Sequence, residues 1–109
     1  MSERELQREI LDALGAIHGV LVWRNNTGSV TRNSRFVRFG VVGQADITGL
    51  LPGGRRLEIE VKTSMGPVRP EQVAFGERIN RNGGLWFIAR TVKDAVDGVL
   101  GALQERSER

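Results

Sequence analysis

The sequence predicts a single α/β domain, a small mixed β-sheet flanked by helices, in the order helix, three strands, helix, strand, helix. Apolar residues recur at helical spacing near both ends of the chain, and short β-rich runs lie between them. Near the C-terminus the order is strand, helix, strand. Such a step within one sheet implies a right-handed crossover. The 109 residues suffice for one hydrophobic core but not comfortably for two. We assign residues 1–103 to this domain and residues 104–109 to a polar C-terminal tail.

The first predicted element is a helix over residues 2–17. Ser2 is a suitable N-cap, and Glu5 stands at the position that completes a capping box. A β-rich run over residues 20–23 then predicts the first strand. The apolar stripe of the helix consists of Leu6, Ile10, Leu11, Ala13, Leu14 and Ile17.

The middle of the chain passes from a polar segment into a β-hairpin. Residues 25–34 are polar and turn-prone, and we expect a loop there. Residues 36–39 could form a short strand or belong to the same excursion. Two strands are predicted over residues 41–51 and 56–63, because the Pro-Gly-Gly sequence at residues 52–54 is a strong turn signal.

The last part of the chain predicts helix, strand and helix. Pro70 suits the first turn of a helix, and the glycine pair at residues 83–84 suits its end. Residues 85–89 are continuously apolar, which is typical of a strand buried on both faces. Thr91 is expected to cap a final helix that runs through Leu103. The aromatic residues expected in the core are Trp23, Phe75, Trp86 and Phe87.

Composition restricts the kind of site and its surroundings. The chain has no cysteine and one histidine, His18, so any metal must be held by oxygen ligands, which points to Mg²⁺, Mn²⁺ or Ca²⁺. We expect His18 to be a capping or surface residue rather than a general base. No phosphate-binding loop supports a nucleotide cofactor, and no histidine–aspartate pair supports a serine nucleophile. Without a membrane span or a signal peptide in the sequence, we expect a cytoplasmic protein with no membrane partner.

The charge distribution suggests an anionic partner. The net charge is +3. Four arginines, Arg24, Arg32, Arg35 and Arg38, fall close together, and the nearest following acid is Asp46. Such side chains make most phosphate contacts in protein–DNA complexes. The alternative is that they are solvated arginines on a loop.

Acidic side chains on the two strands of the predicted hairpin form a candidate site. Because strand side chains alternate between faces, Glu58, Glu60 and Lys62 share one face. A hairpin centred on Gly53 places Asp46 directly across from Glu60, where Cβ atoms are about 4.5–5.5 Å apart. Two carboxylates so close repel each other unless a cation lies between them.

The same arrangement could serve phosphodiester hydrolysis. A divalent ion between Asp46 and Glu60 would lower the pKa of water and polarise a phosphate, and Lys62 could position that water or offset phosphate charge. The alternative is that this strand face is simply the solvated side of an antiparallel sheet.

These residues resemble the signature of the PD-(D/E)xK nuclease superfamily, and most closely its VRR-NUC (virus-type replication-repair nuclease) domains. The proline that often precedes the aspartate in the superfamily is replaced here by Gln44-Ala45. The resemblance covers nearly the whole chain, through residues 3–7, 23–28, 43–47, 59–62, 70–72 and 83–84.

The resemblance implies a restriction-endonuclease-like fold and Mg²⁺- or Mn²⁺-dependent cleavage of DNA. It also implies that Asp46, Glu60 and the Val61 carbonyl are metal ligands, that Lys62 is the catalytic lysine and that Gln72 lies near the site. A glutamate of the first helix would contribute as well. We favour Glu3, with Glu5 and Glu9 as alternatives.

The resemblance further implies action on branched DNA, such as Holliday junctions or flaps, by a homodimer. Two other hypotheses are a non-catalytic DNA-binding module of a replication or repair assembly, and a structural subunit whose charged strand face is merely solvated.

Overall fold

The computed structural model describes residues 1–25, 28–32, 35–63 and 65–107, and the side chains of residues 28–32, 35–39 and 106–107 lie outside the described part. In chain order the elements are α1 (Glu3–Gly15), β1 (Leu21–Arg24), β2 (Gly28–Arg32), β3 (Arg35–Phe39), β4 (Ile47–Leu51), β5 (Arg55–Val61), α2 (Pro70–Arg81), β6 (Leu85–Ala89) and α3 (Val92–Ser107).

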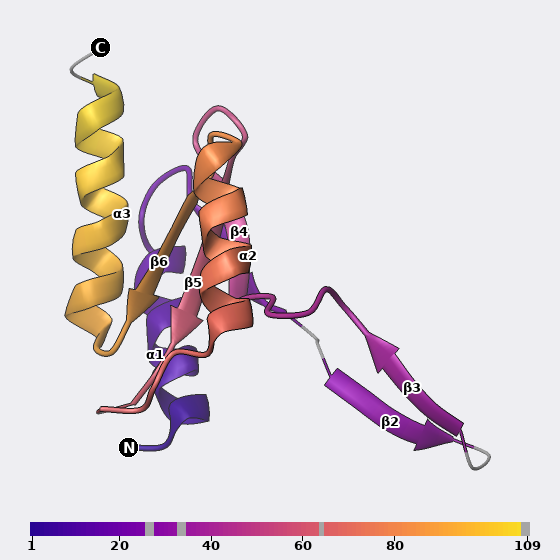
Figure 1. Cartoon of the computed structure of the whole chain (residues 1–109). Helices are drawn as coiled ribbons and strands as arrows, with labels where there is room; N and C mark the ends of the chain where they lie inside the picture. Colours follow the sequence, from indigo (N-terminus) through magenta and orange to yellow (C-terminus); the bar gives the residue numbers. More distant parts are fainter. Residues whose placement is uncertain (26–27, 33–34, 64, 108–109) are drawn as a thin grey trace.

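The main sheet has four strands in the order β1-β4-β5-β6. The pairs β1–β4 and β4–β5 are antiparallel, whereas β5 and β6 are parallel and joined through α2. Helices α1 and α3 lie on one face of this sheet and α2 lies on the other (Figure 1). The predicted mixed sheet flanked by helices is therefore confirmed.

The hydrophobic core lies between the sheet and the pair α1 and α3. Ile10 of α1, Ile59 of β5 and Val99 of α3 are completely buried in it. The α1 stripe reaches this core because the helix begins at its predicted cap, where Ser2 Oγ accepts a hydrogen bond from the Glu5 backbone N–H (3.1 Å). Thr91 caps α3 in the same way, accepting from the Asp94 N–H at 3.0 Å.

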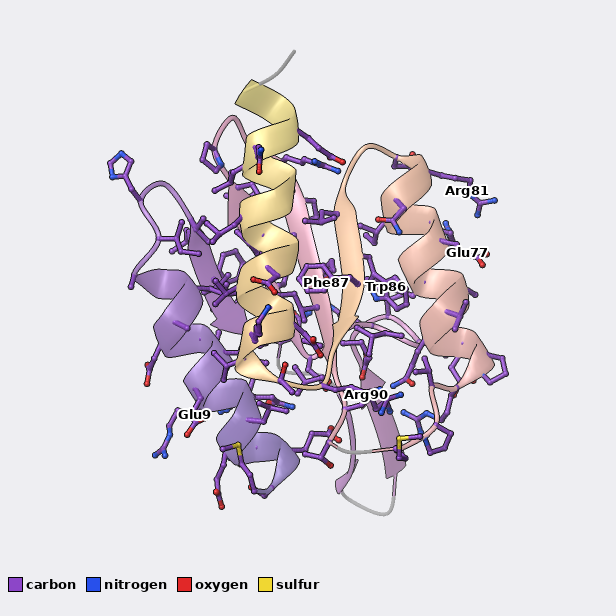
Figure 2. All side chains as sticks on the ribbon, turned by 90° about the vertical axis from the view of Figure 1, so that its left-hand side faces the viewer. Glu9, Glu77, Arg81, Trp86, Phe87 and Arg90 are labelled. Carbon is purple, nitrogen blue, oxygen red and sulfur yellow. The ribbon has the colours of Figure 1, made fainter. Side chains whose placement is uncertain are left out.

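Helix α2 packs closely on the opposite face. A Cβ at Gly76 would lie 2.0 Å from the ring of Trp86, so the absence of a side chain lets the helix rest directly on the indole. Trp86 extends toward α2, whereas Phe87, its neighbour on β6, extends toward α3 (Figure 2). The edge strand β6 is thus covered on both sides, although its first four residues are only partly buried, not fully buried as predicted.

The segment predicted as a loop over residues 25–34 contains a strand. Residues Gly28–Arg32 form β2, which pairs with β3 from Gly28↔Phe39 to Arg32↔Arg35. This separate two-stranded sheet, the arm, extends away from the main domain (Figure 1). The β-branched and aromatic residues of the two strands favour this pairing. The predicted loop over residues 25–34 is therefore wrong for residues 28–32.

Other bounds differ from the sequence prediction. Strand β4 begins at Ile47 rather than Val41, because Gly43 adopts a positive φ of 80° in the turn that precedes it. Helix α3 continues to Ser107, beyond the predicted end at Leu103. Trp23 is 46% exposed rather than part of the core, and His18 is exposed as expected. None of the helices in the described ranges is both long and apolar enough to cross a membrane.

Substituting Gly43 by alanine should destabilise the fold markedly. The added Cβ would lie 2.1 Å from the carbonyl oxygen of Glu71 in α2, and the positive φ is unfavourable for any L side chain. We expect a loss of about 2–4 kcal/mol in the free energy of unfolding, or roughly 10–20 °C in melting temperature. Gly54→Ala is the matched control, because Gly54 has a φ of +83° but open space around it. Equal losses in the two variants would show that the contact with α2 contributes nothing.

Candidate metal-binding and catalytic site

Asp46 and Glu60 lie opposite each other, where β4 begins and β5 ends. The register Ile47↔Ile59 continues to Asp46 and Glu60, so the hairpin has the predicted alignment. Asp46 precedes the first residue of β4 and is held from both sides. Its Oδ2 accepts a hydrogen bond from the Val61 N–H (2.9 Å), and its carbonyl accepts one from the Asn25 N–H (2.8 Å).

Glu60 is a buried carboxyl with one unpaired oxygen. Only 2% of the residue is exposed. Its Oε1 accepts a hydrogen bond from Gln72 Nε2 at 3.0 Å, but its buried Oε2 accepts no hydrogen bond from the described residues. Gln72 is itself fixed, because its Oε1 accepts from the Arg69 N–H (2.9 Å) at the start of α2. Burial of an unsatisfied acceptor is costly, so this oxygen is positioned to bind something.

The electrostatics connect four charged side chains. Burial, the hydrogen bond that a protonated Glu60 shares with Asp46, and the negative charge of Asp46 together raise the pKa of Glu60 to about 9. The charge of Lys62 opposes this rise, and that of Glu3 adds to it. The charges of Asp46, Lys62 and Glu3 therefore all act on Glu60.

The three candidate glutamates of the first helix have different surroundings. Glu3 is the one whose charge acts on Glu60. Glu5 is exposed and supplies the backbone N–H that Ser2 caps. Glu9 is exposed and lines a separate cavity of about 370 Å³ that also includes Thr63 and Arg90.

The donor set at this site consists of oxygen atoms. Within the described ranges, no three or more His, Cys, Asp or Glu side chains come together as a metal site. The described structure brings two carboxylates together here, those of Asp46 and Glu60. The unpaired, buried Oε2 of Glu60 fits a metal ion, and an all-oxygen set suits Mg²⁺ or Mn²⁺.

Two buried polar residues near the site were not predicted. Gln7 is only 9% exposed and accepts a hydrogen bond from Arg24 Nε at 2.8 Å. Glu58 is fully buried and accepts from Thr48 Oγ1 and from Arg56 Nε (2.9 Å). The sequence could have indicated the burial of Gln7, because Gln7 lies on the inward face of α1. It could not have indicated the burial of Glu58, because that burial depends on α2.

The predicted phosphate-binding arginines fall into two groups. Arg24 is partly buried at the end of β1, and its Nη2 also donates to the Arg4 carbonyl (3.4 Å), so its guanidinium is tied to α1. The side chains of Arg32, Arg35 and Arg38 lie outside the described part of the structure, and only their backbone positions on the arm are known.

Comparisons with known proteins show the fold. No protein-family model and no curated protein matched the chain. Among solved structures, a match described as "VRR_NUC domain" has 23% sequence identity and a TM-score of 0.61, and it covers 87% of this chain and 90% of that chain. Because likeness at this identity establishes architecture rather than activity, the conclusion concerns the fold: this chain has the fold of a VRR_NUC domain, as the sequence predicted.

Proposed function

We propose that this chain is a metal-dependent nuclease that hydrolyses phosphodiester bonds in DNA. The observation that carries the proposal is a buried Glu60 whose Oε2 accepts no hydrogen bond from the described residues, across the hairpin from Asp46 and beside Lys62. A merely solvated strand face would expose Glu60, which is 2% exposed. The likeness to a VRR_NUC domain supports the same chemistry.

The metal, Mg²⁺ or Mn²⁺, would be held by Asp46, Glu60 and the Val61 carbonyl. When bound, it would supply positive charge next to a phosphate oxygen and lower the pKa of water. The protein's contribution is to keep the two carboxylates in place. The Val61 N–H orients Asp46, and the Gln72 amide orients Glu60.

Lys62 acts on the reacting phosphate. It follows Val61 at the end of β5, and its backbone N–H donates to the Ala89 carbonyl (3.1 Å), which extends the pairing with β6. Its ammonium offsets the charge that builds on phosphate oxygens as water attacks phosphorus. One P–O bond to a deoxyribose oxygen then breaks, and that oxygen takes up a proton. The negative charge of Glu3, at the start of α1, also acts on Glu60.

The proposal extends to branched DNA, such as Holliday junctions or flaps, cut by a homodimer. The resemblance to VRR-NUC domains supports this choice, because one site cuts one strand and a symmetric second copy would supply another. The arm supports contact with DNA beyond the cut. It carries Arg32, Arg35 and Arg38 and projects on the α2 side of the main sheet (Figure 1).

Cleavage assays test the proposal. Linear, nicked, flap and four-way-junction DNA would be incubated with the chain in Mg²⁺, Mn²⁺ or EDTA. We expect products only with metal, reduced more than about 100-fold in Asp46→Asn and Glu60→Gln. Glu77→Gln is the control, since it removes an exposed carboxylate of α2 that points away from the sheet (Figure 2).

Two outcomes would contradict the proposal. DNA binding without products in any metal would identify a non-catalytic binding module. No binding even at low salt would exclude both activities. If phosphate contacts by the arginines dominate, affinity should fall steeply with salt concentration, and a flat response would count against them.

Gln72→Leu should weaken metal binding without unfolding the protein. The change removes the hydrogen bond to Glu60 and the contact with the Arg69 N–H. We expect Mn²⁺ affinity to fall by about 10–100-fold, the usual effect of losing a partner that orients a ligand. Isothermal titration calorimetry measures this, with Glu71→Gln as a control one position away. Unchanged affinity in Gln72→Leu would show that Gln72 does not orient Glu60.

A further inference from the structure

Helix α2 covers this sheet face over β5 and β6. Among the described residues, β1 and one position of β4 carry exposed apolar side chains on the same face, although Thr48 of β4 is buried. The exposed fractions are 57% for Leu21, 46% for Trp23 and 38% for Leu50. The pairs Leu21↔Leu50 and Trp23↔Thr48 place these residues on the face that also carries Asp46 and Glu60.

Trp23 lies next to the acidic pair. Its partner across the strands is Thr48, two residues from Asp46, so Trp23 and Asp46 are diagonal neighbours. Such neighbours on one sheet face are about 7–8 Å apart, within reach of an aromatic side chain. The strands remain joined beyond this point, because the Asn25 N–H donates to the Asp46 carbonyl (2.8 Å). An exposed indole therefore adjoins the carboxylates.

The charges around Trp23 favour a nucleic acid rather than an apolar partner. The sequence has no Asp or Glu between Asp12 and Asp46, so neither β1, which carries Trp23, nor the arm that follows contains an acidic residue. On the same face, Leu50 is paired with Arg56, whose side chain is 53% exposed and forms an ion pair with the buried Glu58 (2.9 Å). A nucleotide combines a flat apolar base with a negative phosphate, so it matches an exposed indole on a segment that contains no acidic residue.

We propose that Trp23 stacks on an unpaired base of the DNA strand whose phosphate lies at Asp46 and Glu60. This inference rests on the proposed function and specifies its substrate. A base within a duplex has its faces covered by neighbouring bases, whereas a base in a single strand, a flap or a branch point offers a free face. Trp23 is thus a specificity-determining residue that favours DNA unpaired next to the cut.

Binding measurements without metal test this inference. The Trp86→Phe variant leaves Trp23 as the sole tryptophan, so fluorescence reports on it directly. In EDTA, we expect oligo(dT) to quench this emission and a blunt duplex of equal length to quench it far less. In the otherwise natural chain, Trp23→Leu should lower oligo(dT) affinity by about 5–150-fold, measured by anisotropy, and change duplex affinity little. Trp23→Phe, which keeps an aromatic face, should retain most of the affinity.

Several results would overturn it. These are an oligo(dT) affinity that Trp23→Leu does not change, a lack of quenching, or equal losses for oligo(dT) and duplex. If Trp23→Leu instead turns a dimer into a monomer with oligo(dT) affinity intact, the indole belongs to a protein interface. Because these assays use no metal, they are separate from the nuclease test. Quenching without cleavage would contradict only the proposed nuclease activity. Cleavage that does not depend on Trp23 would contradict only the proposed stacking.

Discussion

Replacement of Lys62 by methionine is expected to lower the metal-dependent cleavage rate by about 10²–10⁴-fold at saturating metal. Methionine keeps an unbranched apolar stem of similar length and removes the ammonium. The backbone bond from residue 62 to the Ala89 carbonyl does not depend on the side chain, so the end of β5 should stay in place. Single-turnover assays on the best-cleaved DNA would measure the loss.

The control for this prediction separates two roles of Lys62. Its charge also lowers the pKa of Glu60, so its removal should weaken metal binding near neutral pH. Raising the metal concentration or the pH compensates for that effect but does not replace an ammonium at the phosphate. If high metal fully restored the rate in Lys62→Met, Lys62 would act only through Glu60. Lys62→Arg, which keeps the charge, should recover part of the rate.

Glu60→Gln is expected to abolish a specific dependence of stability on pH. Burial raises the pKa of Glu60 in the folded chain to about 9 from its ordinary value of 4.5, so the fold favours the protonated form. The stability this provides is fully present below pH 4.5 and is lost as pH rises through 9. In metal-free buffer, the stability of Glu60→Gln relative to the natural chain should therefore increase steadily from pH 5 to pH 9. Melting temperatures measured across this range would test it.

Metal binding supplies a second readout of the same proton. Because a ligand carboxyl must lose its proton, Mn²⁺ binding at pH 7 should release roughly one proton, and affinity should rise toward pH 9. Calorimetry in buffers of different ionisation enthalpy measures the release. Glu60→Gln should bind Mn²⁺ weakly and release no proton. Proton-independent binding in the natural chain, or parallel pH profiles for the two proteins, would contradict this interpretation.

The sequence predicted the alignment of Asp46 with Glu60 because that alignment depends on local information. The Pro-Gly-Gly turn fixes the centre of the hairpin, and alternation along β5 fixes the face. It favoured Glu3 but left Glu5 and Glu9 open as alternatives. That choice depends on where the start of α1 lies relative to β5, which is a matter of tertiary packing.

Dependence on tertiary packing also explains where the sequence predictions were wrong. The burial of Glu58 and the exposure of Trp23 both follow from how much of one sheet face α2 covers, and no pattern within either strand encodes this. The sequence predicted a loop over residues 25–34 because polar residues outweigh the β-branched ones there, and it left residues 36–39 open as a short strand. Its strands pair with each other outside the main sheet, so burial imposes no apolar alternation on them.

Because helices cover the two faces of the main sheet unequally, mutations on the two faces should have different effects. Substitutions among the residues under α1 and α3, such as Ile10 or Val99, should change how readily the domain melts while leaving its chemistry intact. Substitutions on the half-open side, around Trp23, should alter which DNA is chosen at little thermodynamic cost. New substrate preferences could therefore evolve on this scaffold without endangering its folding.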